Sequence, residues 1–115
     1  MRPLEIGYLK HGDVSAVTLQ GGIVLGPPVD SVRQTLGNLL QHGENKLVLN
    51  LAGVDRLDSS GIGVLVWALQ ASKGSGGDMR LTQLPRVVAQ TLKMCQLLPL
   101  FAVFDTDEAA IASFE

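Results

Sequence analysis

The stretch LDSSGIGV, residues 57–64, brings together residue types that do chemistry. A carboxylate, Asp58, precedes the hydroxyls of Ser59 and Ser60, and two glycines follow at short spacing. The stretch stands where an apolar strand pattern gives way to an apolar helix pattern. Free backbone N–H groups and the helix dipole at such a junction favour anionic groups, phosphate included. The stretch is therefore either an ordinary helix start or a site of phosphate chemistry.

A nucleotide-binding loop is the first chemical interpretation, because glycine-rich turns between a strand and a helix cradle phosphates. Gly61 and Gly63 lack the third glycine of the dinucleotide fingerprint, and no Gly-Lys-Ser or Gly-Lys-Thr ending marks a P-loop. The motif therefore argues against a bound nucleotide.

A hydrolase nucleophile is the second interpretation, since a serine on a strand-to-helix turn resembles a nucleophile elbow. That elbow needs glycines two positions before and two after the serine, and neither Ser59 nor Ser60 has both. His11 and His42 lie in no motif that would make either a catalytic base. With no second catalytic group identifiable, we expect no enzymatic activity and no cofactor.

A serine phosphorylated by a partner is the third interpretation. A phosphate on Ser59 would add about −1.5 to −2 charges at a helix N-terminus, where the fold tolerates them. Together with Asp58 and Asp55 it would concentrate negative charge on one small surface, so modification would release a bound partner without unfolding the chain. The plainer alternative is that Asp58, Ser59 or Ser60 simply caps the helix.

Two features beside the serines favour more than a cap. Gly61 and Gly63 each cost a helix about 1 kcal/mol relative to alanine, which suggests close approach by another backbone or by a partner. A second apolar stripe on the same helix consists of Val64, Trp67, Ala68 and Ala71. A helix that is apolar on two sides is either buried or docks on something, and burial of Trp67 against a neighbouring helix is the alternative to docking.

Composition limits the kind of protein. A chain of 115 residues, 46% hydrophobic and 17% charged, predicts one globular domain over 1–115. Its nine Lys and Arg and eleven Asp and Glu form no basic block, so we expect no nucleic-acid partner. The single cysteine, Cys95, is expected to be a small buried residue, and with His11 and His42 far apart no metal site is expected. Because no apolar run has the length of a signal peptide or a membrane span, we expect a cytoplasmic protein without membrane insertion.

Strands and helices are predicted to alternate after an initial hairpin. The predicted elements are strands at 4–9 and 14–19, a helix beginning at 27–31 and stopped by Gly43, a strand at 47–51, a helix over about 60–73, a strand at 79–83, a helix at 85–97, a strand at 101–104 and a short final helix. The order ββαβαβαβα predicts an α/β fold, with a mixed, mostly parallel sheet packed against about four helices. The nearly all-apolar run at 47–51 suits a central strand covered on both faces. Gly21-Gly22 is expected to end the second strand, and Asp105 with Glu108 to form a capping box.

The run Asp58-Ser59-Ser60-Gly61-Ile62-Gly63, inside a ββαβαβαβα chain of this length, resembles the STAS domain of bacterial anti-sigma factor antagonists. The similarity extends from the strand at 14–19 to the closing DTDEAAIASF. Such proteins bind a serine kinase that doubles as an anti-sigma factor, and thereby free the sigma factor for transcription. The kinase phosphorylates the first serine of the motif, and a phosphatase resets it. The resemblance implies that Ser59 is the phosphoacceptor, with Ser60 as second choice, and that Asp58 supports the acceptor loop.

The resemblance also implies partners and a partner-binding surface. The partners would be an ATP-binding anti-sigma serine kinase with a histidine-kinase-like fold and a serine phosphatase, and the chain itself would be a monomer or a weak dimer. The implied surface consists of Asp58, Ser59, Ser60, Gly61, Ile62, Gly63 and Val64, together with Gly22 and Val24.

One segment departs from the family pattern. Many members carry Gly-Glu-x-Asp at the end of the second strand, where this sequence has Gly21-Gly22-Ile23-Val24. In the family that segment lies near the acceptor serine, so the two missing acids bear on which kinase binds. The alternative function is a non-switching scaffold, or a component of a signalling or lipid and anion transport assembly.

Overall fold

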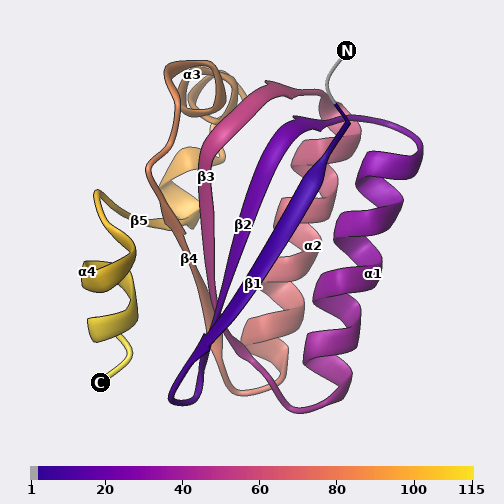
Figure 1. Ribbon diagram of the computed structural model, residues 1–115. Helices are drawn as coiled ribbons and strands as arrows, with labels where there is room; N and C mark the ends of the chain where they lie inside the picture. The colour runs from indigo at the N-terminus through magenta and orange to yellow at the C-terminus, as the bar shows by residue number, and fades with distance from the viewer. Residues whose placement is uncertain (1–2) are drawn as a thin grey trace.

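Five strands form one sheet in a computed structural model that describes residues 3–115 (Figure 1). The strands lie in chain order and are β1 (Glu5–His11), β2 (Val14–Ile23), β3 (Lys46–Leu57), β4 (Asp78–Thr82) and β5 (Ala102–Phe104). β1 and β2 form an antiparallel hairpin, and every other neighbouring pair is parallel. The predicted mixed, mostly parallel sheet is thus confirmed.

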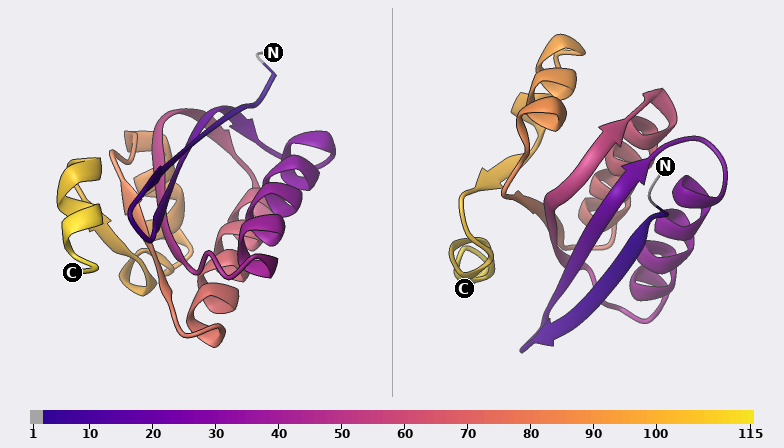
Figure 2. Two further views of the ribbon diagram at one scale, coloured as in Figure 1. Left: turned by 60° about the horizontal axis from the view of Figure 1, so that its bottom comes forward. Right: turned by 45° about the horizontal axis from the view of Figure 1, so that its top comes forward.

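The helices lie on both faces of this sheet. They are α1 (Pro27–Gln41), α2 (Ser59–Gly74), α3 (Arg86–Met94) and α4 (Asp107–Ala112), with a 3₁₀ turn η1 (Leu98–Leu100) before β5. Right-handed crossovers between successive parallel strands place α1 and α2 side by side on one face, while α4 lies on the other (Figures 1 and 2). The order ββαβαβαβα is confirmed, and α3 lies near the end of the sheet where β3 finishes.

The middle of β3 is buried on both faces, as the all-apolar run predicted. Leu47, Leu49 and Leu51 belong to the large core beneath α1 and α2, whereas Val48 points the other way and packs with Val14 and Ala110 of α4. Successive side chains of a strand face opposite sides, so a strand covered on both faces is apolar at nearly every position.

The second apolar stripe of α2 is covered by α1. Val64 and Ala68 are fully buried, and Trp67 is half-buried beneath Arg33, whose guanidinium lies 4.9 Å from the centre of the indole ring. A Cβ on Gly37 of α1 would stand 3.7 Å from the tip of that ring. The stripe therefore packs inside the protein, which supports burial of Trp67 over docking.

The second strand and the third helix end at other residues than the sequence predicted. β2 continues through Gly21-Gly22 to Ile23, because the lack of side chains lets the backbone shift register against β3 and pass close to the start of the chain. A Cβ on Gly21 would stand 2.8 Å from the Pro3 carbonyl oxygen. α3 ends at Met94, so Cys95 is exposed rather than buried, and that prediction was wrong.

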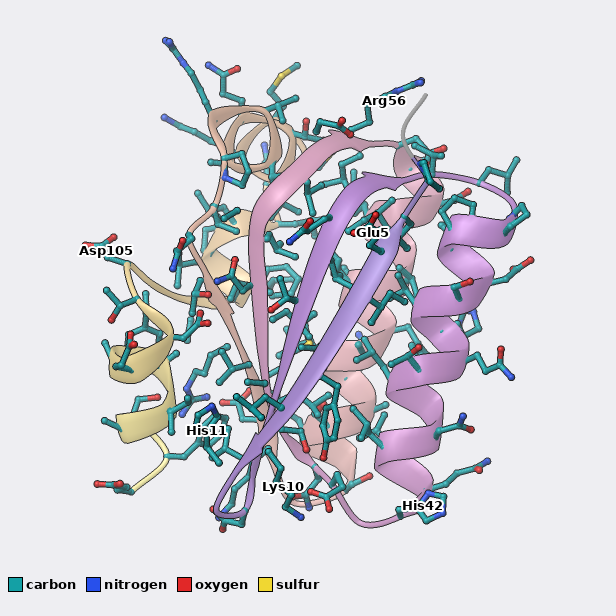
Figure 3. All side chains as sticks on the ribbon, viewed as in Figure 1. Glu5, Lys10, His11, His42, Arg56 and Asp105 are labelled. Atoms are coloured by element: carbon teal, nitrogen blue, oxygen red, sulfur yellow. The ribbon has the colours of Figure 1, made fainter. Side chains whose placement is uncertain are left out.

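The start of α4 also differs from the prediction. Thr106, not Asp105, caps the helix, its Oγ1 accepting a hydrogen bond of 3.1 Å from the Ala109 N–H. Asp105 is exposed and extends away from the body of the protein in Figure 3. A threonine hydroxyl, like a carboxylate, can accept a hydrogen bond from a free N–H at a helix start.

Asp107, the first residue of α4, attaches this short helix to the sheet. Its carboxylate accepts a hydrogen bond of 2.5 Å from the Thr82 hydroxyl of β4 and bonds of 3.1 and 3.2 Å from the Asn50 side-chain amide of β3. Thr82 is fully buried, so its hydroxyl depends on this carboxylate.

We predict that Asp107→Ala destabilises the protein by about 1–3 kcal/mol, because it leaves the buried Thr82 hydroxyl without an acceptor. Urea denaturation measures the loss. Asp105→Ala is the matched control, since that carboxylate makes no hydrogen bond within residues 3–115. An equal loss in both variants would contradict the role given to Asp107.

Candidate functional site

The stretch 57–64 connects β3 to α2 at the edge of the sheet where β2 also ends (Figure 1). Asp58 is the N-cap residue of α2, with an extended backbone. Its Oδ1 accepts a hydrogen bond of 2.9 Å from the Gly61 N–H, and its carbonyl accepts one of 2.9 Å from the Ile62 N–H. Of the three possible caps in the sequence, Asp58 is the one used.

The other oxygen of Asp58 reaches a second segment of the chain. Its Oδ2 accepts a hydrogen bond of 2.9 Å from the Leu25 N–H, in the connection between β2 and α1. Donation by the Leu25 N–H, and next by the Gly61 N–H, holds the pKa of the Asp58 carboxyl below its usual value. Asp58 is thus ionised at neutral pH with both oxygens occupied, which makes it a brace between two loops and a poor candidate for a proton acceptor.

Ser59 is the accessible hydroxyl of the pair. It is exposed as the first residue of α2, and within residues 3–115 its hydroxyl has no hydrogen-bond partner. Ser60 is half-buried. One helical turn after Ser59 comes Gly63, on the same face and also exposed.

The two glycines of the stretch have different surroundings. A Cβ on Gly61 would stand 2.1 Å from the Ile23 carbonyl oxygen, so the helix start lies directly against the end of β2. A Cβ on Gly63 would meet nothing within 4 Å. The close backbone approach suggested by the sequence is therefore made by the chain itself at Gly61, while Gly63 leaves a bare spot on the surface beside Ser59.

Only part of the surface implied by the resemblance is open to solvent. Gly22, Gly61 and Val64 are buried, with Val64 fully enclosed, so their contribution is to the packing beneath the surface. Half-buried are Val24, Asp58, Ser60 and Ile62, and exposed are Ser59 and Gly63.

Leu25, which no sequence motif marked, is 75% exposed and lies beside Asp58, whose carboxylate accepts its backbone N–H. Leu25 lies in no periodic pattern, between the end of a strand and Gly-Pro-Pro. A large apolar residue in a short loop, outside any strand or helix pattern, is the sequence signal that could have indicated an exposed apolar contact at Leu25.

A carboxylate lies near the position where the family pattern has an acid. A Cβ on Gly22 would stand 3.9 Å from an Asp55 carboxylate oxygen and 3.5 Å from the Arg56 Cβ, because Gly22 pairs with Arg56 across the two strands. Asp55 and Arg56 are both exposed, and Arg56 projects outward at this edge in Figure 3.

Among residues 3–115 no group of three or more His, Cys, Asp or Glu side chains could hold a metal ion. Within the same residues, none of the helices has the length and apolar character that crossing a membrane requires.

Comparison with known proteins identifies the family. The sequence profile of the STAS domain matches residues 6–110, nearly the whole chain. The chain belongs to the STAS domain family. This STAS domain is 26% identical over 113 residues to the anti-sigma F factor antagonist of Paenibacillus polymyxa, covering 97% of the chain and 96% of that protein.

Solved structures share the fold of this STAS domain. An anti-sigma factor antagonist from Mycobacterium paratuberculosis superposes with a TM-score of 0.86 at 19% identity, covering 97% of this chain and 94% of that one. The phosphorylated form of the Bacillus cell fate determinant SpoIIAA superposes with a TM-score of 0.75 at 17% identity, covering 98% and 100% of the two chains.

We predict that Gly61→Ala destabilises this STAS domain by about 3 kcal/mol, since the added methyl would overlap the Ile23 carbonyl and push α2 away from β2. Gly63→Ala is the matched control on the same helix. It should stabilise the protein by up to about 1 kcal/mol, because alanine favours a helix over glycine and the space is open. Thermal or urea unfolding distinguishes the two, and equal effects would contradict the close approach at Gly61.

We predict that Asp58→Asn destabilises the protein at neutral pH, because the ionised carboxylate accepts two backbone N–H bonds. A carboxyl whose pKa is lowered by folding stabilises the fold above its unfolded pKa and loses that effect as pH falls through the folded pKa. The difference in unfolding free energy between wild type and variant should therefore shrink below the usual value of 3.8. Denaturation series from pH 7 to pH 3 measure this, and a constant difference would contradict it.

Proposed function

We propose that this STAS domain is an anti-sigma factor antagonist that binds an anti-sigma serine kinase and is switched off by phosphorylation of Ser59. The observation that carries the proposal is the exposed Ser59 hydroxyl, unpartnered within residues 3–115, on a helix start held in place by Asp58. The names of two sequence relatives, from Paenibacillus polymyxa and Bordetella bronchiseptica, support the antagonist function.

The kinase supplies the chemistry in this proposal. The Ser59 Oγ attacks the γ-phosphorus of ATP held by the kinase, an Oγ–P bond forms, and the bond from that phosphorus to the ADP oxygen breaks. The hydroxyl proton passes to a base on the kinase, because the nearby Asp58 carboxylate already accepts two backbone hydrogen bonds. The phosphatase restores the hydroxyl by hydrolysing the Oγ–P bond.

The switch acts through charge at the surface. A phosphate would bring about −1.5 to −2 charges to a helix N-terminus that can bear them. A partner seated on Leu25, Ser59 and the bare spot at Gly63 would meet that charge next to Asp58, so binding is lost while the fold is kept.

Asp55 supports the same surface despite the absent acids at Gly22 and Val24. Its carboxylate lies beside Gly22 and is exposed at the end of β3. In this proposal Asp55 provides from β3 the negative charge that the family pattern places at the end of β2.

We predict that Ser59→Ala retains binding to the anti-sigma kinase and that Ser59→Asp loses most of it, because aspartate adds charge where the partner docks. Pull-down with candidate anti-sigma kinases encoded in the same genome, at fixed salt, measures this. Ser60→Ala is the matched control and should bind like wild type. If Ser59→Ala and Ser59→Asp both bind as well as wild type, the proposed switch is wrong.

Incubation of the chain with the same kinases and ATP, followed by mass spectrometry, identifies which serine is phosphorylated. Phosphate is expected on Ser59 in the wild type and none on Ser59→Ala. Phosphate on Ser60 of Ser59→Ala at the wild-type rate would assign the acceptor role to Ser60 instead.

A further inference from the structure

Residues 79–104, from β4 to β5, carry positive charges only. Residues 79–104 contain Arg80, Arg86 and Lys93 and no Asp or Glu, although the whole chain has eleven acidic and nine basic residues. Arg80 is paired with Asp78. Arg86 and Lys93 on α3 are exposed and, within residues 3–115, have no acidic partner.

Exposed apolar side chains gather on the same segment. Met94, at the end of α3, is 84% exposed, and Val87 lies two helical turns before it. Leu100 in η1, which packs against α3, and Val103 in β5 are exposed as well. We call this basic and apolar area the α3 surface; its residues are Arg86, Val87, Lys93, Met94, Leu100 and Val103.

An acidic groove lies between β1 and α4. α4 packs against β3, β4 and β5, its Ala110 also packs with Val14 at the start of β2, and the groove opens between α4 and β1. We call it the α4 groove; its lining is Leu9, His11, Asp107, Glu108, Ile111, Ala112 and Glu115. Leu9 is 62% exposed there, and Figure 3 shows His11 at the end of β1 on the side of α4. The lining contains the exposed acids Glu108 and Glu115 and no Lys or Arg, while the third acid, Asp107, has its carboxylate bonded to Thr82 and Asn50.

We infer that the α3 surface of one copy docks into the α4 groove of a second copy. The α3 surface is basic and apolar and the α4 groove is acidic and apolar, so the two are complementary in charge and in apolar character. α3 lies at one end of the sheet and the groove extends toward the hairpin at the other, so one molecule cannot join its own two surfaces (Figures 1 and 2).

Such a contact is head-to-tail. Each added copy leaves one α3 surface and one α4 groove free at the ends, so the assembly grows with protein concentration instead of stopping at a closed dimer. The contact uses neither Ser59 nor Leu25, so this inference goes beyond the proposed function and stands or falls separately from it.

Sedimentation of the purified chain over a range of concentrations at low salt tests the contact. The average mass of the wild type should rise with concentration, and added salt should suppress the rise because it screens the charges. Met94→Glu and Leu9→Glu, both at exposed positions, should each weaken self-association at least about tenfold. Leu25→Glu is the matched control at a leucine outside both surfaces, and Ser59→Asp should likewise associate as wild type does.

A mixture of the two variants gives the sharper result. Met94→Glu keeps its groove and Leu9→Glu keeps its α3 surface, so an equimolar mixture should form 1:1 dimers and nothing larger. A wild type that stays monomeric at every concentration would overturn the inference, as would a mixture that stays monomeric. Loss of association in Met94→Glu but not in Leu9→Glu would also overturn it, because the contact would then join two α3 surfaces.

Discussion

The Asp58 carboxylate binds two backbone segments at once, and the candidate site depends on that brace. One oxygen caps α2 at Gly61 and the other holds the β2–α1 connection at Leu25. Without it the helix start and the neighbouring loop would lose the hydrogen bonds that join them through one carboxylate, although Gly61 would still pack against the Ile23 carbonyl. Together, the Asp58 hydrogen bonds and the Gly61–Ile23 contact hold the β2–α1 and β3–α2 connections side by side as one surface.

That surface rests on a core that leaves it little freedom. β2 and β3 pair in parallel up to Ile23 and Leu57, immediately before the two braced segments, and α1 and α2 pack side by side over them. The position of Ser59 is therefore fixed by the paired ends of β2 and β3 and by the packing of α2 against α1. In the proposed function, a phosphate on Ser59 would therefore change the charge of this surface and leave its backbone in place.

The order of elements could be predicted because each carries its own signal. The run at 47–51 is apolar except for Asn50, which suits a strand covered on both faces, and Asp58 stands at the junction where a cap is needed. Features that depend on distant segments could not be predicted. Gly21-Gly22 is a typical turn sequence, yet both glycines pair with β3 and so belong to strand β2.

Two features near helix ends, the exposure of Cys95 and the position of Leu25, could not be predicted from the local pattern. Cys95 continues the apolar periodicity of α3, but the helix stops one residue earlier and exposes it. Leu25 gains its place only through a bond to a carboxylate 33 residues away. The sequence also contains the one departure from the family pattern at Gly22, but only the pairing of β2 with β3 shows that Asp55 lies beside it.

The bond from Leu25 to Asp58 uses the backbone N–H and leaves the side chain uncommitted. Any residue except proline can donate that bond, so position 25 can change in size, charge or polarity while the loop keeps its place. The backbone of Leu25 therefore serves the fold, and its side chain is left for the partner contact of the proposed function. Substitution of this one exposed side chain can therefore alter the surface beside Ser59 without moving the backbone that supports it.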